Sequence, residues 1–126
     1  MVHDGALLLV RRRNEPDAGL WGFPGGHVDL GETVFAAAAR ELAEETSVIA
    51  APEAWLDNLD VIVRDADGGV RFHFLLVAVA CRYVAGAPAP ADDVAEAAWT
   101  PLDAVLARAL PLSADVDRVL RRALDR

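Results

Sequence analysis

The chain has 126 residues and a formal charge of -8 at pH 7, with 20 acidic residues against 12 basic ones. This sign of charge argues against binding nucleic acid through its phosphates, so no nucleic-acid partner is expected. Hydrophobic residues make up 54% of the chain, which is enough for the core of one domain covering residues 1–126. No apolar run approaches the roughly 18 residues of a membrane span, and the first residues lack the order of a secretory signal. We therefore expect a cytoplasmic protein without a membrane partner.

The first predicted strand covers Ala6–Arg12 and follows the turn-like pair Asp4-Gly5. Only residues 1–3 precede that turn, so no partner strand is expected on that side. Residues 14–20 are polar and contain proline and glycine, which predicts a surface loop. The loop leads into WGFPGG, residues 21–26, where the glycines let the backbone approach a ligand closely.

A helix is predicted next. Thr33 is a suitable N-cap, the helix should run to about Thr46, and a break is expected at Ala50–Pro52. On a helical wheel an apolar stripe that can pack against a sheet is formed by Phe35, Ala39, Leu42 and Thr46.

A long hairpin is predicted after the helix. Strands of about Trp55–Arg64 and Val70–Val84 flank Asp67-Gly68-Gly69, which is a strong turn signal. Residues 85–93, rich in alanine, proline and aspartate, should form a mobile loop. A short strand is expected over Glu96–Thr100.

Two helices should end the chain. Pro101 is expected at the first position of one of them, and an amphipathic helix should cover about Ala114–Leu124. Strands on both sides of a central helix fit an α/β fold with a mixed sheet covered on two faces. The only cysteine, Cys81, lies among apolar residues and should be a small buried side chain, so no disulfide forms within the chain. His73, on the second hairpin strand, is expected to pack across the strands rather than bind a metal.

The predicted helix gathers negative charge. Glu41, Glu44 and Glu45 share an arc of about 100° beside the apolar stripe, although like charges at this spacing repel each other. A solvated acidic face, with Arg40 paired to Glu44, is one interpretation. The carbonyls of the preceding glycines and the nearby Glu32 favour another, because such hard oxygen ligands suit Mg²⁺ or Mn²⁺.

Gly26, then Glu32 six residues later, then RELAEETSV at residues 40–48, resembles the box of the Nudix hydrolase family, G-x5-E-x7-R-E-U-x-E-E-x-G-U with U apolar. Every specified position matches except Ser47, where the family usually has glycine at the helix C-terminus. The segments ALLLVRR, LWGFPGG and EAAWTPLDAV are also similar to the usual surroundings of the box. The resemblance therefore covers most of the chain.

The resemblance implies a fold and an activity. The fold would be the Nudix α/β/α sandwich, with a mixed β-sheet between helices. The activity would be hydrolysis of a diphosphate linkage in a nucleoside diphosphate joined to another group, with Mg²⁺ or Mn²⁺ as cofactor. We expect a small-molecule nucleotide substrate, either a nucleotide sugar such as ADP-ribose or a modified nucleoside triphosphate.

The resemblance also implies roles for residues of the box. The implied metal ligands are the carboxylates of Glu41, Glu44 and Glu45, the backbone carbonyl of Gly25, and Glu32, which would orient the site or bind through water. Arg40 would be the ion-pair partner that fixes a glutamate. Glu44, Glu45 and Arg40 are thus expected in the catalytic machinery.

A general base is expected from outside the box. The candidates are Glu96, Asp93 and Asp92, and Glu96 has the best spacing, three residues before Trp99. An exposed strand carboxylate is an equally good interpretation of Glu96, because a shifted pKa cannot be seen in a sequence.

Substrate contacts have weaker signals. The candidates are Arg11, Arg12 and Arg13 for phosphate, of which only one or two can face a cleft, His27 at the mouth of the site, and Trp21 for stacking on a base. Packing of the indole of Trp21 against the core is at least as good an interpretation.

Family members normally begin with a strand ahead of the one at Ala6–Arg12. A chain starting at Met1 would leave an apolar strand edge there, and such edges invite pairing with another molecule. We therefore expect either a homodimer through this edge or a natural chain that starts upstream.

Two other classes of function stay open. The chain could be a nucleotide-binding or regulatory module that kept the Nudix fold and lost catalysis, which the intact set of glutamates argues against. It could also be a structural domain with a solvated acidic helix, but that reading does not explain the glycine loop and the spacing together.

Overall fold

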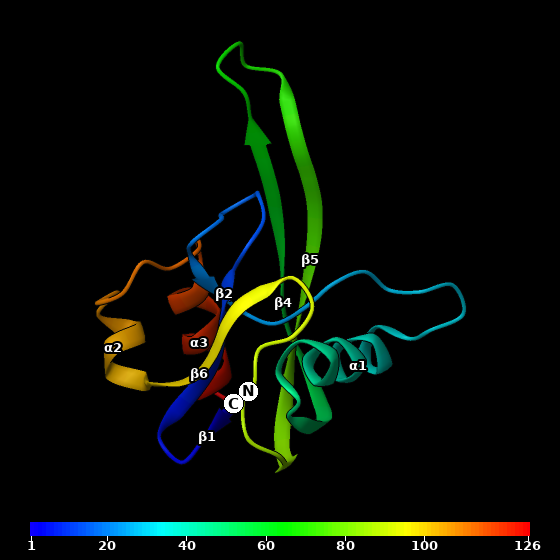
Figure 1. The fold of residues 1–126 in the computed structure, drawn as a ribbon, viewed down its shortest axis with the longest axis vertical. Coiled ribbons are helices and arrows are strands. Elements are labelled where there is room, and N and C mark those ends of the chain that lie inside the picture. The colour runs from blue at the N-terminus through cyan, green and yellow to red at the C-terminus, as the bar shows by residue number, and fades with distance from the viewer.

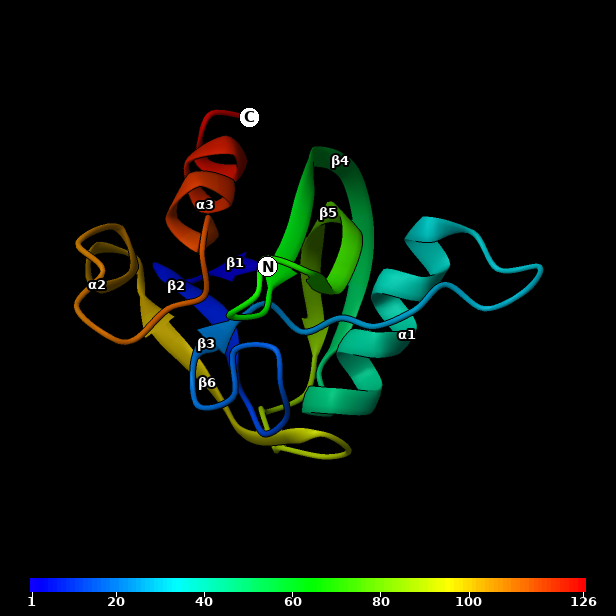
Figure 2. The ribbon, with the colours of Figure 1, turned by 90° about the horizontal axis from the view of Figure 1, so that it is seen from above.

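The computed structural model describes residues 1–126. It contains six strands and three helices, which are β1 (Val2–His3), β2 (Ala6–Arg12), β3 (Trp21–Gly22), α1 (Val34–Thr46), β4 (Ile49–Arg64), β5 (Val70–Ala85), β6 (Val94–Pro101), α2 (Leu102–Leu106) and α3 (Val116–Leu124). The β4–β5 hairpin stands out from the rest of the molecule as a long arm (Figure 1). Helices α2 and α3 lie on one side of the strands and α1 lies on the other (Figure 2). This arrangement confirms the predicted α/β/α class.

Strand β2 is the centre of a four-stranded sheet. One edge pairs with β6 along its whole length, from Ala6 opposite Pro101 to Arg12 opposite Val94. The other edge pairs with β1 and then with β3. The turn at Asp4-Gly5 makes this possible, because both residues have positive φ and fold the first residues back onto β2.

The expected open edge at Ala6–Arg12 is therefore wrong. The sequence offered no partner strand because β1 has only two residues, too few to show a pattern. With both edges of β2 covered, the edge that was expected to drive a homodimer is absent.

The β4–β5 hairpin forms a second, two-stranded sheet. The predicted turn is confirmed, but the predicted break at Ala50–Pro52 is wrong, because β4 already begins at Ile49. A register shift between Pro52 and Ala54 lets the strand pass the proline, which cannot donate a ladder hydrogen bond. All named strand pairs are antiparallel, and parallel pairing is limited to a bridge between Trp21 and Leu112.

Helix α1 begins and ends where its capping residues predict. The hydroxyl of Thr33 accepts a hydrogen bond from the backbone N–H of Ala36 at 3.1 Å. Ser47 takes the left-handed conformation, with φ of 64°, and its N–H bonds the carbonyl of Ala43. Serine thus adopts the backbone conformation for which the family usually uses glycine.

Leu42 packs with Leu8 and Val48 in a buried cluster between α1 and the sheet. Phe35 does not share this burial, since 37% of it is exposed, and its expected place in the buried stripe is wrong. It lies in the first turn of α1, whereas the buried contacts of the helix are made by Ala37, Leu42 and Thr46.

The C-terminal helix joins the two sheets. Val116 and Leu120 of α3 pack with Leu7 and Leu9 of β2, while Val119 packs with Leu59 and the rest of a second cluster on the hairpin. Pro101 is the N-cap of α2, one residue before the position predicted for it. None of the three helices has the length and apolar character that a membrane span requires.

Two smaller predictions concern single side chains on β5. Cys81 is buried, as predicted, and burial raises the pKa of its thiol. His73 is exposed and lies opposite Ile62 on β4.

Candidate functional site

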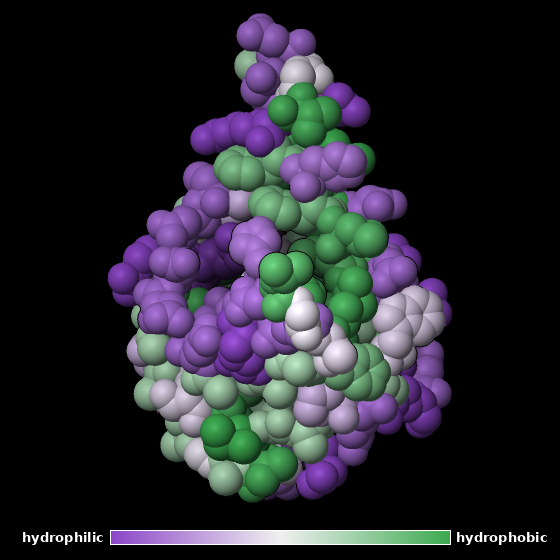
Figure 3. Space-filling model, turned by 90° about the vertical axis from the view of Figure 1, so that its right-hand side faces the viewer, coloured by the Kyte–Doolittle hydropathy of each residue, from purple (hydrophilic) through white to green (hydrophobic).

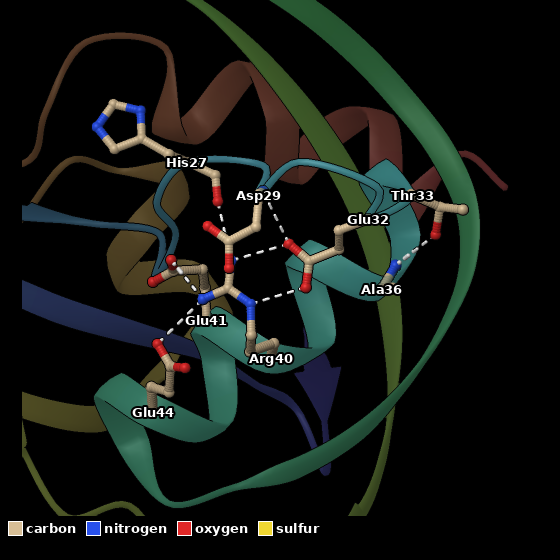
Figure 4. A network of polar contacts seen from close by, with 8 residues as sticks. All are labelled: His27, Asp29, Glu32, Thr33, Ala36, Arg40, Glu41 and Glu44. Atoms are coloured by element: carbon tan, nitrogen blue, oxygen red, sulfur yellow. Dashed lines mark hydrogen bonds and ion pairs between the residues drawn. The ribbon is translucent and has the colours of Figure 1, made fainter.

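Arg40 organises the acidic face of α1 (Figure 4). Its Nε and Nη2 donate to the two oxygens of Glu32 at 2.7 and 2.9 Å, which is a bidentate pair. Its Nη1 donates to Glu41 Oε1 at 2.9 Å and to Glu44 Oε2 at 3.1 Å. Its Nη2 also donates to the carbonyl oxygen of His27 at 2.9 Å. One guanidinium therefore fastens the loop before the helix to two glutamates of the helix.

Hydrogen bonds hold both carboxylate oxygens of Glu32 in place within this network. Both of its oxygens face Arg40, and Oε1 also accepts from the backbone N–H of Asp29 at 3.1 Å. The hydrogen bond from Arg40, together with that from Asp29, lowers the pKa of Glu32 below its ordinary value. The same contacts to Glu32 and Glu41 raise the pKa of Arg40. Glu32 is thus placed to orient the site.

The loop touches the helix most closely at Gly26. A Cβ placed on this residue would collide with the carboxyl group of Glu41. A Cβ on Gly25 would meet open space, so of these two glycines only Gly26 lies against the carboxyl group of Glu41. Glycine at this position lets the loop lie directly against a carboxylate.

Glu45 lies one turn further along α1, where it is half-buried. Its Oε2 accepts a hydrogen bond from the backbone N–H of Gly25 at 3.0 Å. Burial raises the pKa of Glu45 to about 7, and the negative charges of Glu41 and Asp92 add to this rise, whereas the Gly25 N–H and Arg12 oppose it. A negative charge at Glu45 is therefore costly unless a cation compensates it.

The donor set fits a hard divalent cation. Each of three glutamates uses one oxygen in a positioning hydrogen bond, Glu41 and Glu44 to Arg40 and Glu45 to Gly25, which leaves the other oxygen of each for a ligand. As they stand, no three acidic, histidine or cysteine side chains are gathered closely enough to hold an ion. Binding would therefore require rotation of glutamate side chains, which have three rotatable bonds.

A large open groove of about 1620 Å³, lined by residues of both sheets and of α3, reaches these carboxylates. The candidate site residues that line it, together with the glycine loop, are Arg12, Gly25, Gly26, His27, Glu41, Glu45 and Asp93. Pockets for small molecules usually have about 300 to 1,000 Å³, so the groove exceeds the size that one nucleotide needs.

Glu96 and Arg11 do not join the carboxylates of α1. Arg11 Nη2 pairs with Glu96 Oε1 at 2.8 Å across β2 and β6. Successive residues of a strand point to opposite faces, so Arg11 lies on the face of Leu9, which packs against α2 and α3, while Leu8 packs against Leu42 of α1. The best-spaced base candidate is thus held in a surface ion pair on the other face of the sheet.

Arg12 and Asp92 are brought to Glu45 instead. The loop 86–93 is fastened to the end of α1, where the N–H of Ala91 donates to the carbonyl oxygen of Glu45 at 3.0 Å. The charges of Arg12 and Asp92 both act on the Glu45 carboxyl group. No sequence pattern favours Arg12 over its neighbours, because residues 7–10 are all apolar and show no alternation.

The remaining substrate candidates, Arg13, Trp21 and His27, also differ in whether they line the groove. Arg13 is exposed and its Nη2 donates to the carbonyl oxygen of Val94 at 3.4 Å, outside the groove. Trp21 packs against the cluster around Leu7, which supports the packing interpretation of its indole. Of Arg13, Trp21 and His27, only His27 lines the groove.

The pKa of Glu45 predicts a pH dependence of stability. A carboxyl group whose pKa rises from 4.5 to about 7 on folding stabilises the fold while it is protonated, and this contribution is lost as the pH rises through that interval. We expect the free energy of unfolding of metal-free protein to fall between pH 5 and pH 8, measured by urea denaturation in EDTA. Glu45→Gln should remove this part of the pH dependence, and an equal slope in both proteins would contradict the assignment.

Comparison with known proteins agrees with this geometry. The sequence model of the NUDIX domain matches residues 1–123. An ADP-ribose pyrophosphatase of Methanocaldococcus jannaschii is 33% identical over 100 residues, which are 79% of this chain and 57% of that protein. The chain spans about half the length of the curated relatives it matches.

Solved structures share the fold. The MutT NUDIX hydrolase from Burkholderia pseudomallei superposes with a TM-score of 0.79 and 29% identity, covering 97% of this chain and 91% of that one. The NUDIX domain of Shewanella oneidensis NrtR, complexed with ADP ribose, gives a TM-score of 0.72 and 32% identity, covering 98% and 80%.

Fold and site together define an α/β/α domain that presents a glutamate-rich helix to a glycine loop. The chain belongs to the Nudix family.

Proposed function

We propose that this chain, as one domain of residues 1–126, hydrolyses a diphosphate linkage in a nucleoside diphosphate joined to another group. The observation that carries the proposal is the placement of Glu41 and Glu45, with Arg12, along one groove. ADP-ribose-like compounds come first as substrates, because a relative is named ADP-ribose pyrophosphatase and another family domain was solved with ADP ribose. Modified nucleoside triphosphates come second.

The residues of α1 would hold Mg²⁺, with Mn²⁺ as a substitute. We assign the oxygens of Glu41, Glu44 and Glu45 that make no positioning hydrogen bond as ligands, together with the carbonyl oxygen of Gly25. When bound, the metal would neutralise the diphosphate and lower the pKa of the attacking water. Arg40 would act as a positioning residue that holds the loop and the helix together.

Groups outside the box would complete the chemistry. Arg12 supplies positive charge on the groove and would hold a phosphate oxygen of the substrate. Asp92 or Asp93, on the loop fastened to the end of α1, would take the proton of the attacking water. These two replace Glu96 as base candidates, because Glu96 is paired with Arg11 on the opposite face.

A substrate panel tests the activity. Purified protein with Mg²⁺ is incubated with ADP-ribose, dinucleoside polyphosphates, 8-oxo-dGTP and ordinary nucleoside triphosphates, and the products are separated by anion-exchange chromatography. Release of nucleoside monophosphate or of phosphate or diphosphate from at least one compound supports the proposal. Nucleotide binding without any turnover would instead indicate a binding module.

Metal should also stabilise the fold. We expect millimolar Mg²⁺ or Mn²⁺ to raise the melting temperature, because a cation relieves the repulsion among Glu41, Glu44 and Glu45 only in the folded state. Differential scanning fluorimetry with Mg²⁺, Mn²⁺, Ca²⁺ and Zn²⁺ measures the shift. The absence of a shift with all four ions would favour a solvated acidic face.

A further inference from the structure

Two phenylalanines lie on the less exposed face of the hairpin arm. Phe72 and Phe74 point to the same face of β5, and their partners across the hairpin are Val63 and Val61. Further down the arm the same face carries Leu59, which is buried under α3. Near the tip no helix covers this face, and neither phenylalanine belongs to a buried cluster.

The arm is exposed along much of its length. Figure 3 shows it standing out from the body with apolar side chains along it. Phe72 and Phe74 are half-buried and line the same groove as Glu41 and Glu45. Their rings lie 6.2 Å apart with an interplanar angle of 20°, so they form a continuous aromatic surface.

His27 joins this surface to the acidic helix. Its ring lies 6.5 Å from that of Phe74, tilted by 52°. Its carbonyl oxygen is held by Arg40 at 2.9 Å, and the preceding residue, Gly26, lies against the carboxyl group of Glu41. The imidazole points away from the Arg40 network (Figure 4). Gly26 and His27 are adjacent in the chain, so their backbone links the carboxyl group of Glu41 to the rings of Phe74 and Phe72.

The groove therefore has two chemically different ends. Carboxylates with Arg12 form the end that suits a metal-bound diphosphate, and aromatic rings form the end that suits a flat, uncharged group. A nucleoside diphosphate has the same polarity, with charge at one end and a planar base at the other. Stacking on an aromatic side chain contributes about 1 to 3 kcal/mol per base in nucleic-acid binding and does not depend on the identity of the base.

We propose that His27 and Phe74, with Phe72 behind them, form the stacking site for the nucleobase of the substrate. The inference rests on the proposed diphosphate hydrolysis and names the part of the substrate that the hairpin arm recognises. Stacking far from the reacting bond is equal in the ground state and the transition state, so these residues should set KM rather than kcat. The adenine of an ADP-ribose-like compound would satisfy the site, as would other bases.

The test compares Phe74→Leu, which keeps an apolar side chain but removes the ring, with Val70→Ala nearer the tip of the same strand. Val70 is 51% exposed and does not line the groove, so it is a control for disturbance of the arm. We expect Phe74→Leu to raise KM for the best nucleotide substrate about 10- to 100-fold with little change in kcat. Hydrolysis of a phosphoribosyl diphosphate without a base should change less than threefold, and Val70→Ala should leave both substrates unaffected.

Failure of this inference can be told from failure of the proposed function. If wild-type protein hydrolyses no diphosphate in the panel, the activity is wrong, and the stacking site is then decided by calorimetric binding of AMP to wild type and Phe74→Leu. Equal KM or equal AMP affinity in these two proteins would overturn the stacking site. An equal loss with the base-free substrate would also overturn it, because it would show a general disturbance of the groove.

Discussion

We expect Glu45→Gln to lower turnover by several orders of magnitude and, at the same time, to raise the melting temperature of metal-free protein at pH 8. The loss of turnover follows from removing a negative charge assigned to the metal while the shape of the side chain is kept. The gain in stability follows from burial, which already raises the pKa of Glu45 to about 7. Glutamine carries no charge to desolvate, and its amide oxygen can still accept from the N–H of Gly25.

The opposite signs of these two effects make the prediction specific. Steady-state kinetics in Mg²⁺ measures turnover, and calorimetry in EDTA measures stability. Glu53→Gln is the matched control, because Glu53 lies on β4 and pairs with Arg82 and Arg126 rather than with the residues around Arg40. Near-normal turnover of Glu45→Gln would refute the assignment of this residue, and a lower melting temperature would refute the argument from burial.

Local signals in the sequence predicted the helix of the box and the turn of the hairpin correctly. The N-cap at Thr33 and the end of the helix at Thr46 depend on residues a few positions away, and both are confirmed. The turn of the hairpin was visible for the same reason, since Asp67-Gly68-Gly69 determines its own backbone conformation. Glutamates on one helix face follow from the helical period alone.

Long-range pairing decided the features that the sequence did not show. Leu7 to Val10 are at most 2% exposed, because β2 is covered on both faces, so nothing in the pattern says which face of the strand meets α1. Whether Arg11 or Arg12 lies on the α1 side of the sheet depends on which face of β2 meets α1. The face on which Glu96 lies was hidden for the same reason, since its register opposite Arg11 places it on the side of α2 and α3.

Very short and irregular strands could not be predicted from the alternation of apolar and polar residues either. Strand β1 has two residues and β3 has two, and both depend on pairing with β2 for their existence. Strand β4 crosses Pro52 with register shifts, so a residue that usually ends a strand gave a false boundary.

Arg40→Lys is expected to lower metal affinity and kcat about 10- to 100-fold, the usual effect of losing a group that orients metal ligands. Arginine donates here to Glu32 with two nitrogens, to Glu41 and Glu44 with a third, and to the carbonyl of His27 as well. Lysine keeps the positive charge but presents a single nitrogen, which cannot meet all these acceptors at once.

The expected consequence is a loop that separates from the helix, with less well-positioned oxygens on Glu41 and Glu44. Mn²⁺ titration by calorimetry measures metal affinity, and kinetics at saturating metal measures what remains of kcat. Arg82→Lys is the control, because Arg82 is exposed and pairs only with Glu53 at 3.4 Å. If Arg40→Lys bound Mn²⁺ as tightly as Arg82→Lys and kept its kcat, positive charge alone would suffice at this position, and the bidentate geometry would have no part in positioning the ligands.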